Sequence, residues 1–207
     1  MSDGGYDEGY LACPCFWGSV PGSLILTLED RIRSFAGLSV LDVGCGEGKN
    51  SLYIASKGAA VSAYDVSDIA IEHARCAGNG GAANNPIFEV KDVTNEQRIV
   101  GYYDIVIAYG LFHCLKDGDT IMRVCRMLQS ATKPGGFMVV CAFNDRSQDL
   151  SAHPGFHPIT LRHEEYIRAF NGWKLIEAHD RDLHEVHPHN AIPHTHSMTR
   201  IIAQKPV

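Results

Sequence analysis

Short apolar runs that end in Gly or Asp alternate with helical patterns along most of the chain. The apolar runs are Leu38–Val43, Ala60–Tyr64, Ile87–Val90, Tyr103–Tyr109 and Gly136–Phe143. Helical patterns lie between them, near residues 49–57, 68–77 and 118–131. Strands that alternate with helices form parallel sheets whose crossover connections are right-handed. This alternation constrains the fold more than any other feature of the sequence, and it predicts an α/β architecture.

The two flanks of this region complete the predicted sheet. A leading helix is expected near residues 23–35, where apolar side chains recur at helical spacing and Gly37 follows as a stop signal. Beyond the fifth run, a helix around 163–170 precedes a strand at Trp173–His184 and a last strand from about His194 to Gln204. We expect these two strands to form a hairpin at one edge. The prediction is a single α/β domain with a seven-stranded, mostly parallel sheet and a C-terminal antiparallel strand.

Composition narrows the classes of partner. The chain has 207 residues and a formal net charge of −6, without a cluster of Lys and Arg, so neither nucleic acid nor an anionic membrane is an expected partner. No apolar run approaches the ~20 residues of a membrane span. Seven scattered cysteines without paired CxxC motifs predict buried free thiols in a reducing compartment, and hence a cytoplasmic protein. A small-molecule substrate fits this composition, which carries no signal for an oligomeric state.

A glycine-rich loop, Leu41–Gly48, ends the first predicted strand and opens the following helix. Gly44 permits a tight turn with positive φ, and the bare backbone at Gly46 and Gly48 lets a ligand approach closely. The spacing is GxGxG, whereas a dinucleotide fingerprint needs a further glycine where this chain has Lys49. The loop therefore disfavours a pyrophosphate ligand. A carboxylate at Asp42 suits a cationic or amino-bearing ligand instead.

Two further acidic residues end the next two strands. Asp65 follows Asp42 by 23 residues, the distance at which an acidic side chain accepts hydrogen bonds from a ribose diol. Asp92 ends the third run, where it is placed to accept from an exocyclic adenine amine. The alternative is a structural turn followed by two helix-capping aspartates. That alternative applies most directly to Asp92, because Asp92-Val93-Thr94 also reads as the start of a helix.

These residues, the run Tyr103–Leu115 and the segment Lys133–Gly136 together resemble the successive motifs of class I S-adenosylmethionine methyltransferases, over roughly residues 35–145. The resemblance implies a Rossmann-like fold and S-adenosylmethionine as the cofactor. In that family the glycine loop holds the methionine part, the second-strand acid the ribose and the third-strand acid the adenine, while the end of the fourth strand closes over the cofactor. By match, the cofactor-binding residues are Asp42, Gly44, Cys45, Gly46, Gly48, Asp65, Val66, Asp92, Val93, Tyr109 and Gly110.

The fourth strand continues into a segment that bears on the methyl acceptor. Ala108–Leu115 lacks the Asn/Asp-Pro-Pro-aromatic tetrapeptide of enzymes that methylate bases or glutamine, and its apolar version resembles small-molecule methyltransferases. We expect in-line transfer of a methyl group to O, N or S of a small metabolite, with positioning as the main source of acceleration. His113 is a candidate general base. The alternative is that His113 packs beside the cofactor.

Five of the eleven His residues fall between positions 184 and 196. One interpretation is a divalent metal bound by His194, His196 and a third group from the same segment. A second is that His194 or His196 acts as a base or orients the substrate. A third is a polar rim in which the imidazoles pair with the carboxylates of Asp180, Asp182 and Glu185. The full set of candidate metal ligands is His184, Glu185, His189, His194 and His196.

The same tail, with Trp173 and Leu183-His184-Glu185, resembles the C-terminal part of the tellurite-resistance methyltransferase group, which implies a metal- or metalloid-linked acceptor. The remaining alternatives are an RNA or protein methyltransferase, a dehydrogenase on the same fold and a non-catalytic binding protein.

The predicted organisation is one methyltransferase domain over 1–207. Its parts are an N-terminal lid segment at 1–22 carrying Tyr10, Phe16 and Trp17, a cofactor-binding core at 23–145, and a substrate-side loop, helix and hairpin at 146–207.

Overall fold

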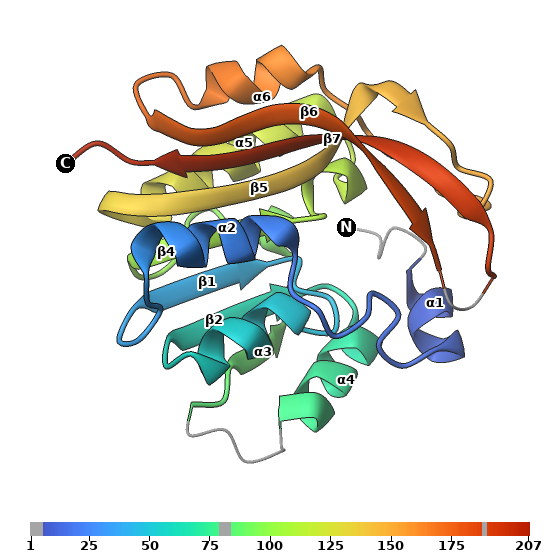
Figure 1. Cartoon of the computed structure of the whole chain (residues 1–207), viewed down its shortest axis with the longest axis horizontal. Helices are drawn as coiled ribbons and strands as arrows, with labels where there is room; N and C mark the ends of the chain where they lie inside the picture. Colours follow the sequence, from blue (N-terminus) through green and yellow to red (C-terminus); the bar gives the residue numbers. More distant parts are fainter. Residues whose placement is uncertain (1–5, 79–83, 188–189) are drawn as a thin grey trace.

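Seven strands form one sheet in the computed structural model, which describes residues 6–78, 84–187 and 190–207. The strand order is β3-β2-β1-β4-β5-β7-β6 (Figure 1). The strands are β1 (Ser39–Val43), β2 (Ala60–Asp65), β3 (Ile87–Val90), β4 (Tyr103–Tyr109), β5 (Thr132–Gln148), β6 (Lys174–Val186) and β7 (Pro193–Gln204). The order reverses beside β1, and this is the point at which open α/β sheets bind their ligands.

The strand directions place the turn of the β6–β7 hairpin at the edge of the sheet where ligands bind. β1 to β5 pair in parallel, whereas β7 runs antiparallel to both β5 and β6. β6 is therefore parallel to β5. The end of β6 and the start of β7 thus lie at the same edge as the carboxyl ends of β1, β2 and β4. The predicted seven-stranded, mostly parallel sheet with a C-terminal antiparallel strand is confirmed.

Helices cover both faces of the sheet (Figure 1). One face packs against α2 (Ser23–Ile32), α3 (Lys49–Ser56) and α4 (Asp68–Gly78), and the other against α5 (Gly118–Ala131) and α6 (His163–Ala169). The period of two along a strand assigns alternate residues to the two layers. In β4, Ile105 and Ile107 join the first buried cluster, and Val106 and Ala108 join the second.

The predicted elements recur, several of them with changed ends, and one helix was not predicted. α1 (Asp7–Ala12) lies within the predicted lid segment and packs its Tyr10 against α4. α2 ends at Ile32 because Arg33 adopts a left-handed conformation with φ of 69°. β5 is longer than the predicted 136–143 because, beyond Phe143, its register with β7 shifts and pairing resumes at Gln148.

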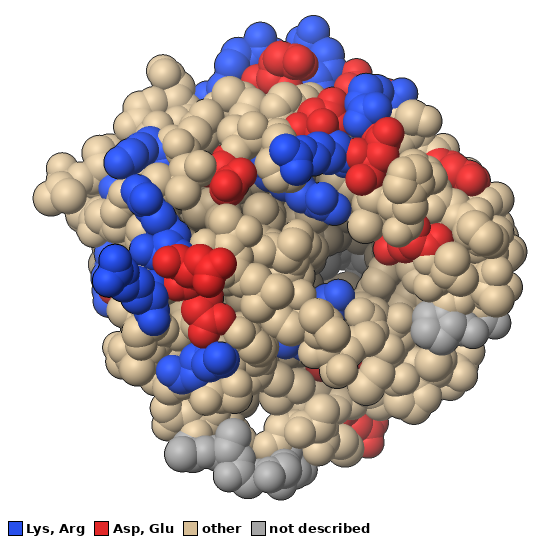
Figure 2. Space-filling view, in the orientation of Figure 1, with Lys and Arg blue, Asp and Glu red and all other residues tan. Residues whose placement is uncertain are grey.

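The surface and the helices bear on the predicted partners. Figure 2 shows Lys and Arg side chains interspersed with Asp and Glu over one face of the molecule, together with a hollow in that face. Among the residues that the structure describes, no helix has both the length and the apolar character needed to cross a lipid bilayer.

Candidate functional site

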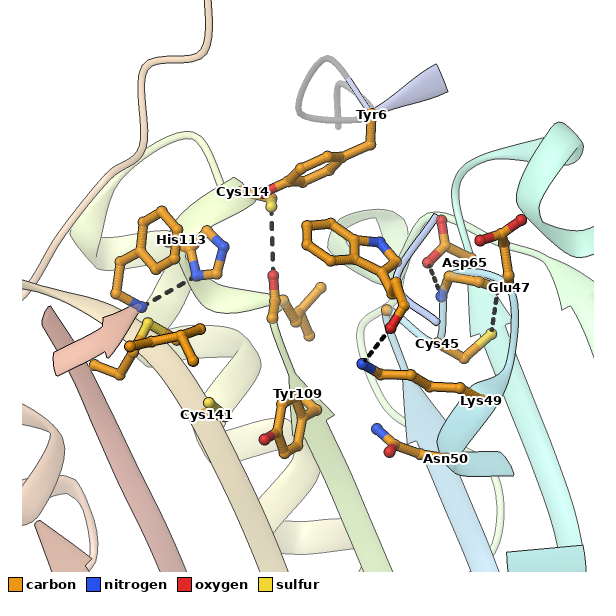
Figure 3. Close-up of a pocket in the computed structure, with 18 of the residues that line it drawn as sticks. Tyr6, Cys45, Glu47, Lys49, Asn50, Asp65, Tyr109, His113, Cys114 and Cys141 are labelled. Carbon is orange, nitrogen blue, oxygen red and sulfur yellow. Dashed lines mark hydrogen bonds between the residues drawn. The ribbon is translucent and has the colours of Figure 1, made fainter. Parts of the chain in front are cut away.

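A cavity of about 400 Å³ lies at the carboxyl ends of the parallel strands, within the range of about 300–1,000 Å³ of small-molecule sites. The loops after β1, β2 and β4 line one side, and β5, β6 and β7 line the other (Figure 3). The segment before α2 covers it with Tyr6, Tyr10 and Trp17. The sheet, the segment before α2 and the ends of α2 and α3 therefore contribute to one cavity.

The three glycines of the loop after β1 have left-handed backbones, with φ of 74°, 53° and 77° at Gly44, Gly46 and Gly48. Gly44 and Gly46 border the cavity, and a Cβ on Gly46 would lie 3.0 Å from the Tyr10 hydroxyl oxygen. Gly48 lies behind the loop, where a Cβ would come within 2.7 Å of the Phe88 ring. The first two glycines keep the cavity open, whereas Gly48 lets the loop pack against β3.

Asp65 is the carboxylate that joins the glycine loop to β2. It lines the cavity and accepts hydrogen bonds from the backbone N–H of Gly46 at 2.7 Å and of Ser67 at 3.0 Å. Burial raises its pKa, and the two backbone donors oppose that shift. A carboxylate offers about four acceptor positions, so Asp65 retains acceptor capacity toward the cavity.

The other two predicted carboxylates lie outside the cavity lining. Asp42 is 1% exposed and accepts from the Ser51 hydroxyl at 2.6 Å, and burial raises its pKa to about 7. Its second oxygen, Oδ1, has no hydrogen-bond partner in the described part of the chain. Asp92 accepts from the N–H and hydroxyl of Thr94 and caps the 3₁₀ turn η1 (Val93–Asn95). Asp92 therefore caps a local turn, as the alternative expects, whereas Asp42 joins β1 to the side chain of Ser51 on α3.

The predicted cofactor residues thus fall into two groups. Those that line the cavity are Gly44, Cys45, Gly46, Asp65, Val66, Tyr109 and Gly110. Those that the cavity lining does not include are Asp42, Gly48, Asp92 and Val93. Val93 is buried in the hydrophobic cluster on the α5 side of the sheet.

Side chains of the glycine loop and of the first turn of α3 hold the lid in place. The Glu47 carboxylate accepts from the backbone N–H of Cys15 at 2.9 Å. The Lys49 ammonium, labelled in Figure 3, donates to the Trp17 carbonyl at 3.1 Å. Asn50 Oδ1 accepts from the backbone N–H of Gly22 at 2.8 Å. The N-terminal segment is consequently attached to the glycine loop and to α3. Of its aromatic residues, the sequence prediction missed Tyr6.

The loop after β4 contributes His113 and Cys114 from the 3₁₀ turn η2 (Phe112–Cys114). The His113 ring stacks on Phe143 at 3.9 Å between centroids, and its Nδ1 accepts from the backbone N–H of Phe143 at 3.2 Å. Burial lowers the pKa of His113 to about 3, which leaves a neutral ring with its proton on Nε2. A general-base role would require that hydrogen bond to break. Figure 3 shows Tyr6 directly above Cys114.

A row of side chains along β7 extends the cavity wall. His194, His196, Met198 and Arg200 alternate along the strand and so share one face. Met198 and Arg200 line the cavity, and His196 stacks on Phe143 at 4.2 Å between centroids. Arg200 Nε is buried without a partner in the described residues.

The pairing of β6 with β7 separates the predicted histidines. Glu185 pairs with His194, and His184 pairs with Thr195, so the two neighbours on β6 face opposite sides. His184 is exposed and hydrogen-bonds the Thr195 hydroxyl through Nδ1 at 2.8 Å. The structure therefore does not bring His184 to the other histidines. His189 lies outside the described residues.

Two histidines that the sequence prediction missed join the group around Glu185. His153, from the segment after β5, and His187, just beyond β6, have Nε2 atoms 3.2 Å apart. The sequence signal for His153 was a His- and Pro-containing segment at 144–158. The predicted carboxylate partners Asp180 and Asp182 bind Arg146 instead, at 2.9 and 2.6 Å.

Known proteins resemble both the sequence and the fold. A ubiquinone biosynthesis O-methyltransferase from Bordetella avium is 31% identical over 119 residues, which cover 56% of this chain and 47% of that protein. The TehB structure from Haemophilus influenzae matches with a TM-score of 0.76 at 18% identity, over 89% of this chain and 62% of that one. A Synechocystis magnesium protoporphyrin IX methyltransferase with bound SAM has a TM-score of 0.66 at 18% identity, over 88% and 76%.

These matches support the fold, but they do not by themselves show the activity of the whole protein. The match covers about half the length of the curated relative, and the structural neighbours are too distant in sequence to show more than a shared Rossmann-like methyltransferase fold. The family model described as "Tellurite resistance protein TehB" matches residues 28–197, a range that includes the glycine loop, β4 and the hairpin up to its histidines. The chain therefore belongs to the TehB family of tellurite resistance proteins.

Proposed function

We propose that this protein is an S-adenosylmethionine-dependent methyltransferase that acts on O, N or S of a small metabolite. The observation that supports this most strongly is the glycine loop tied to Asp65 through Gly46 N–H, at the floor of a cavity that the attached aromatic lid covers. Methyltransferases among the relatives and structural neighbours support the same reaction class.

The residues of the cavity fit the proposed cofactor. Bare backbone at Gly44 and Gly46 leaves room for an amino-acid group, and Asp65 supplies acceptors for ribose hydroxyls. Acidic side chains at Glu47 and Asp65 repel a diphosphate. Arg200, with its unpartnered buried Nε, and Lys49 are suited to a carboxylate. This set matches an adenosine joined to an amino acid better than it matches a dinucleotide.

The chemistry divides between the cofactor and the chain. S-adenosylmethionine supplies an electrophilic methyl group on a positively charged sulfur. The chain contributes position: Tyr6, Cys114 and Glu185 line the part of the cavity beyond the glycine loop, where an acceptor has to lie. The lid excludes water and holds the acceptor in place, and positioning of this kind accounts for much of the acceleration of a displacement reaction.

Calorimetry with S-adenosylhomocysteine tests the proposal. The full chain is expected to bind it, and Asp65→Ala is expected to weaken binding by about 10- to 100-fold, since charge-assisted hydrogen bonds contribute about 1.5–3 kcal/mol each. Asp30→Ala is the matched control, because Asp30 is exposed on α2 away from the cavity. Binding of NADH in place of S-adenosylhomocysteine, or an unaffected Asp65→Ala variant, would contradict the proposal.

A metalloid acceptor is a second candidate that two observations favour. The family match is to tellurite resistance proteins, and three free thiols, Cys45, Cys114 and Cys141, line the cavity. Burial keeps the pKa of Cys45 and Cys141 raised, so these thiols stay protonated. The two candidates are separated by measuring S-adenosylmethionine consumption with tellurite and with a panel of small O, N and S nucleophiles.

We also propose how the chain is organised and where it works. Residues 1–22 act as the lid, 23–145 hold the cofactor, and 146–207 form the acceptor side of one domain. Seven free cysteines favour a reducing compartment such as the cytoplasm.

A further inference from the structure

Four ligand-type side chains meet on the face of the β6–β7 hairpin that also lines the cavity. One donor atom from each of His153, Glu185, His194 and His196 lies within 4.8 Å of all the others. The three histidines are at most 9% exposed, and Glu185 is partly buried and lines the cavity. They come from three segments, namely the stretch after β5, the end of β6 and the start of β7. The methyl-transfer proposal above does not use this cluster as a binding site.

Hydrogen bonds around the cluster fix which nitrogen of each ring carries the proton. The Gln148 amide donates to the carbonyls of Asn144 and Ser197, so its Oε1 has to accept, and His196 Nδ1 donates to it at 2.9 Å. His194 Nδ1 likewise donates to the carbonyl of Ile192 at 2.8 Å. In the neutral rings, Nε2 of His194 and of His196 therefore presents a lone pair to the cluster.

Four of the six distances between the donor atoms are close to those of a coordination shell, and all six are at most 4.8 Å. His153 Nε2 lies 3.1 Å from His194 Nε2 and 3.4 Å from His196 Nε2. Glu185 Oε1 lies 3.5 Å from His194 Nε2 and 3.6 Å from His196 Nε2. Ligands at about 2.0–2.1 Å from a tetrahedral ion are about 3.3 Å apart. The four atoms are thus near enough to bind one metal ion after small side-chain adjustments.

Several lone pairs converge on the cluster. The Nε2 atoms of His194 and His196 face His153 Nε2, and a Glu185 carboxylate oxygen lies beside the same two rings. A cation attracts all of these groups at once. The outer hydrogen bonds from Nδ1 of His194 and His196 correspond to those that orient metal-binding imidazoles in proteins.

We propose that His153, Glu185, His194 and His196 bind one divalent first-row transition-metal ion. Imidazole nitrogens with a single carboxylate suit zinc, iron, cobalt, nickel or copper, whereas magnesium and calcium take oxygen ligands. Of the ligands expected from the sequence, Glu185, His194 and His196 stay in the proposed set. His153 takes a place for which the sequence suggested His184 or His189.

The proposed ion would connect the β6–β7 side of the cavity to the residues that contact the lid segment. Tyr6 packs edge-on against His153 at 6.3 Å between centroids. Phe16 stacks on His187 at 4.9 Å, and His187 Nε2 lies 3.2 Å from His153 Nε2. An ion held by three separate segments would therefore fix the position of the wall and of the aromatic contacts of the lid.

Zinc binding by the full chain tests the proposal directly. After removal of metals with a chelator, titration with Zn²⁺ is expected to show one site per chain by calorimetry. Free Zn²⁺ at about a hundredfold above Kd is expected to raise Tm by about 5–10 °C, since a ligand that binds only the folded state stabilises it. Co²⁺ is expected to give the visible absorption bands of a four-coordinate site.

Variants assign the ligands and guard against simple unfolding. His194→Ala with His196→Ala should abolish zinc binding, and Glu185→Gln, which keeps the shape of the side chain, should weaken it by at least tenfold. His184→Ala is the matched control, because His184 lies on the same strand and faces the other way. Circular dichroism checks that each variant is folded.

Two results would overturn the metal site: a wild-type chain that takes up no more Zn²⁺ than the double variant, or a His184→Ala variant that loses as much zinc as the others. S-adenosylhomocysteine binding measured on the same samples separates this outcome from failure of the proposed methyl transfer. Intact cofactor binding without zinc rejects only the metal site, and the converse result rejects only the proposed function.

Discussion

The two ends of the cavity are built in different ways. At the cofactor end, the contacts are mostly made by backbone groups of one short loop, and the key carboxylate, Asp65, lies 19 residues from the Gly46 N–H that it binds. At the acceptor end, side chains meet from segments 41 to 48 residues apart, as with His153 and His194 or His196 and Gln148. Local sequence dictates the first end, whereas strand register dictates the second.

The largest expected effect tests whether the cofactor end depends on backbone shape. Gly48→Ala should destabilise the fold by about 2–4 kcal/mol, because left-handed strain adds to a clash with Phe88. Gly37→Ala is the control, since Gly37 has the same φ of 77° but nothing within 4 Å of its Cβ position. Urea unfolding measures both. Equal losses in the two variants would show that packing behind the loop is unimportant.

The second effect tests whether the acceptor end depends on side chains that orient other side chains. Gln148→Leu removes the acceptor for His196 Nδ1 and should weaken zinc binding by about 10- to 100-fold. Gln129→Leu serves as the control, because Gln129 bonds the Ala169 carbonyl far along the chain from the cluster. Calorimetric titration compares the two. An unchanged zinc affinity in Gln148→Leu would remove the tautomer argument.

A smaller effect concerns the lid, which spans both ends. Trp17 Nε1 donates to the Tyr10 hydroxyl at 3.2 Å, and Trp17→Phe keeps an aromatic ring but removes this donor. We expect about fivefold faster release of S-adenosylhomocysteine, in line with about 1 kcal/mol for one hydrogen bond. Stopped-flow fluorescence measures the rate. Trp173→Phe alters the second Trp, which packs with Phe170 away from the cavity, and should leave the rate unchanged.

The smallest expected effect concerns the amino ends of β1, β4 and β5, away from both ends of the cavity. Lys133 lies 2.8 Å from Asp104 and, with the Ser39 donors, lowers the pKa of Asp104 to about 2 although burial opposes this. A lowered folded-state pKa gives stability that is present above about pH 4 and is lost as pH falls toward 2. Since both groups are about one-third exposed, Asp104→Asn should cost about 0.5 kcal/mol at pH 7 and much less at pH 2, where the carboxylate is about half protonated. Thermal unfolding against pH checks this.

Most strands and helices were predictable because their patterns are local. The predicted strands at 87–90 and 103–109 and the predicted helix at 118–131 have the bounds that the structure shows. α1 was not predictable in this way, because its six residues include Gly9 and carry no apolar period. Its stability comes from the contact of Tyr10 and Phe16 with Ala70, which lies in another segment.

The site was predictable only as far as short motifs reach. Gly44, Gly46 and Asp65 follow a spacing that has a physical meaning at strand ends, and all three line the cavity. Asp92 fits the same spacing equally well, yet its carboxylate caps η1. His153 has no motif, since it reaches Glu185 and His194 only after β5, β6 and β7 have paired.

Glu185 pairs with His194, and the next pair is His184 with Thr195. Side chains of β6 and β7 therefore alternate between the cavity face and the opposite face with a period of two residues. Inserting or deleting one residue in β6 before His184 would exchange the inward and outward rows of that strand, sending His184 toward the cavity and Glu185 toward solvent. Only an insertion or deletion of an even number of residues in these strands should therefore keep the same side chains facing the cavity.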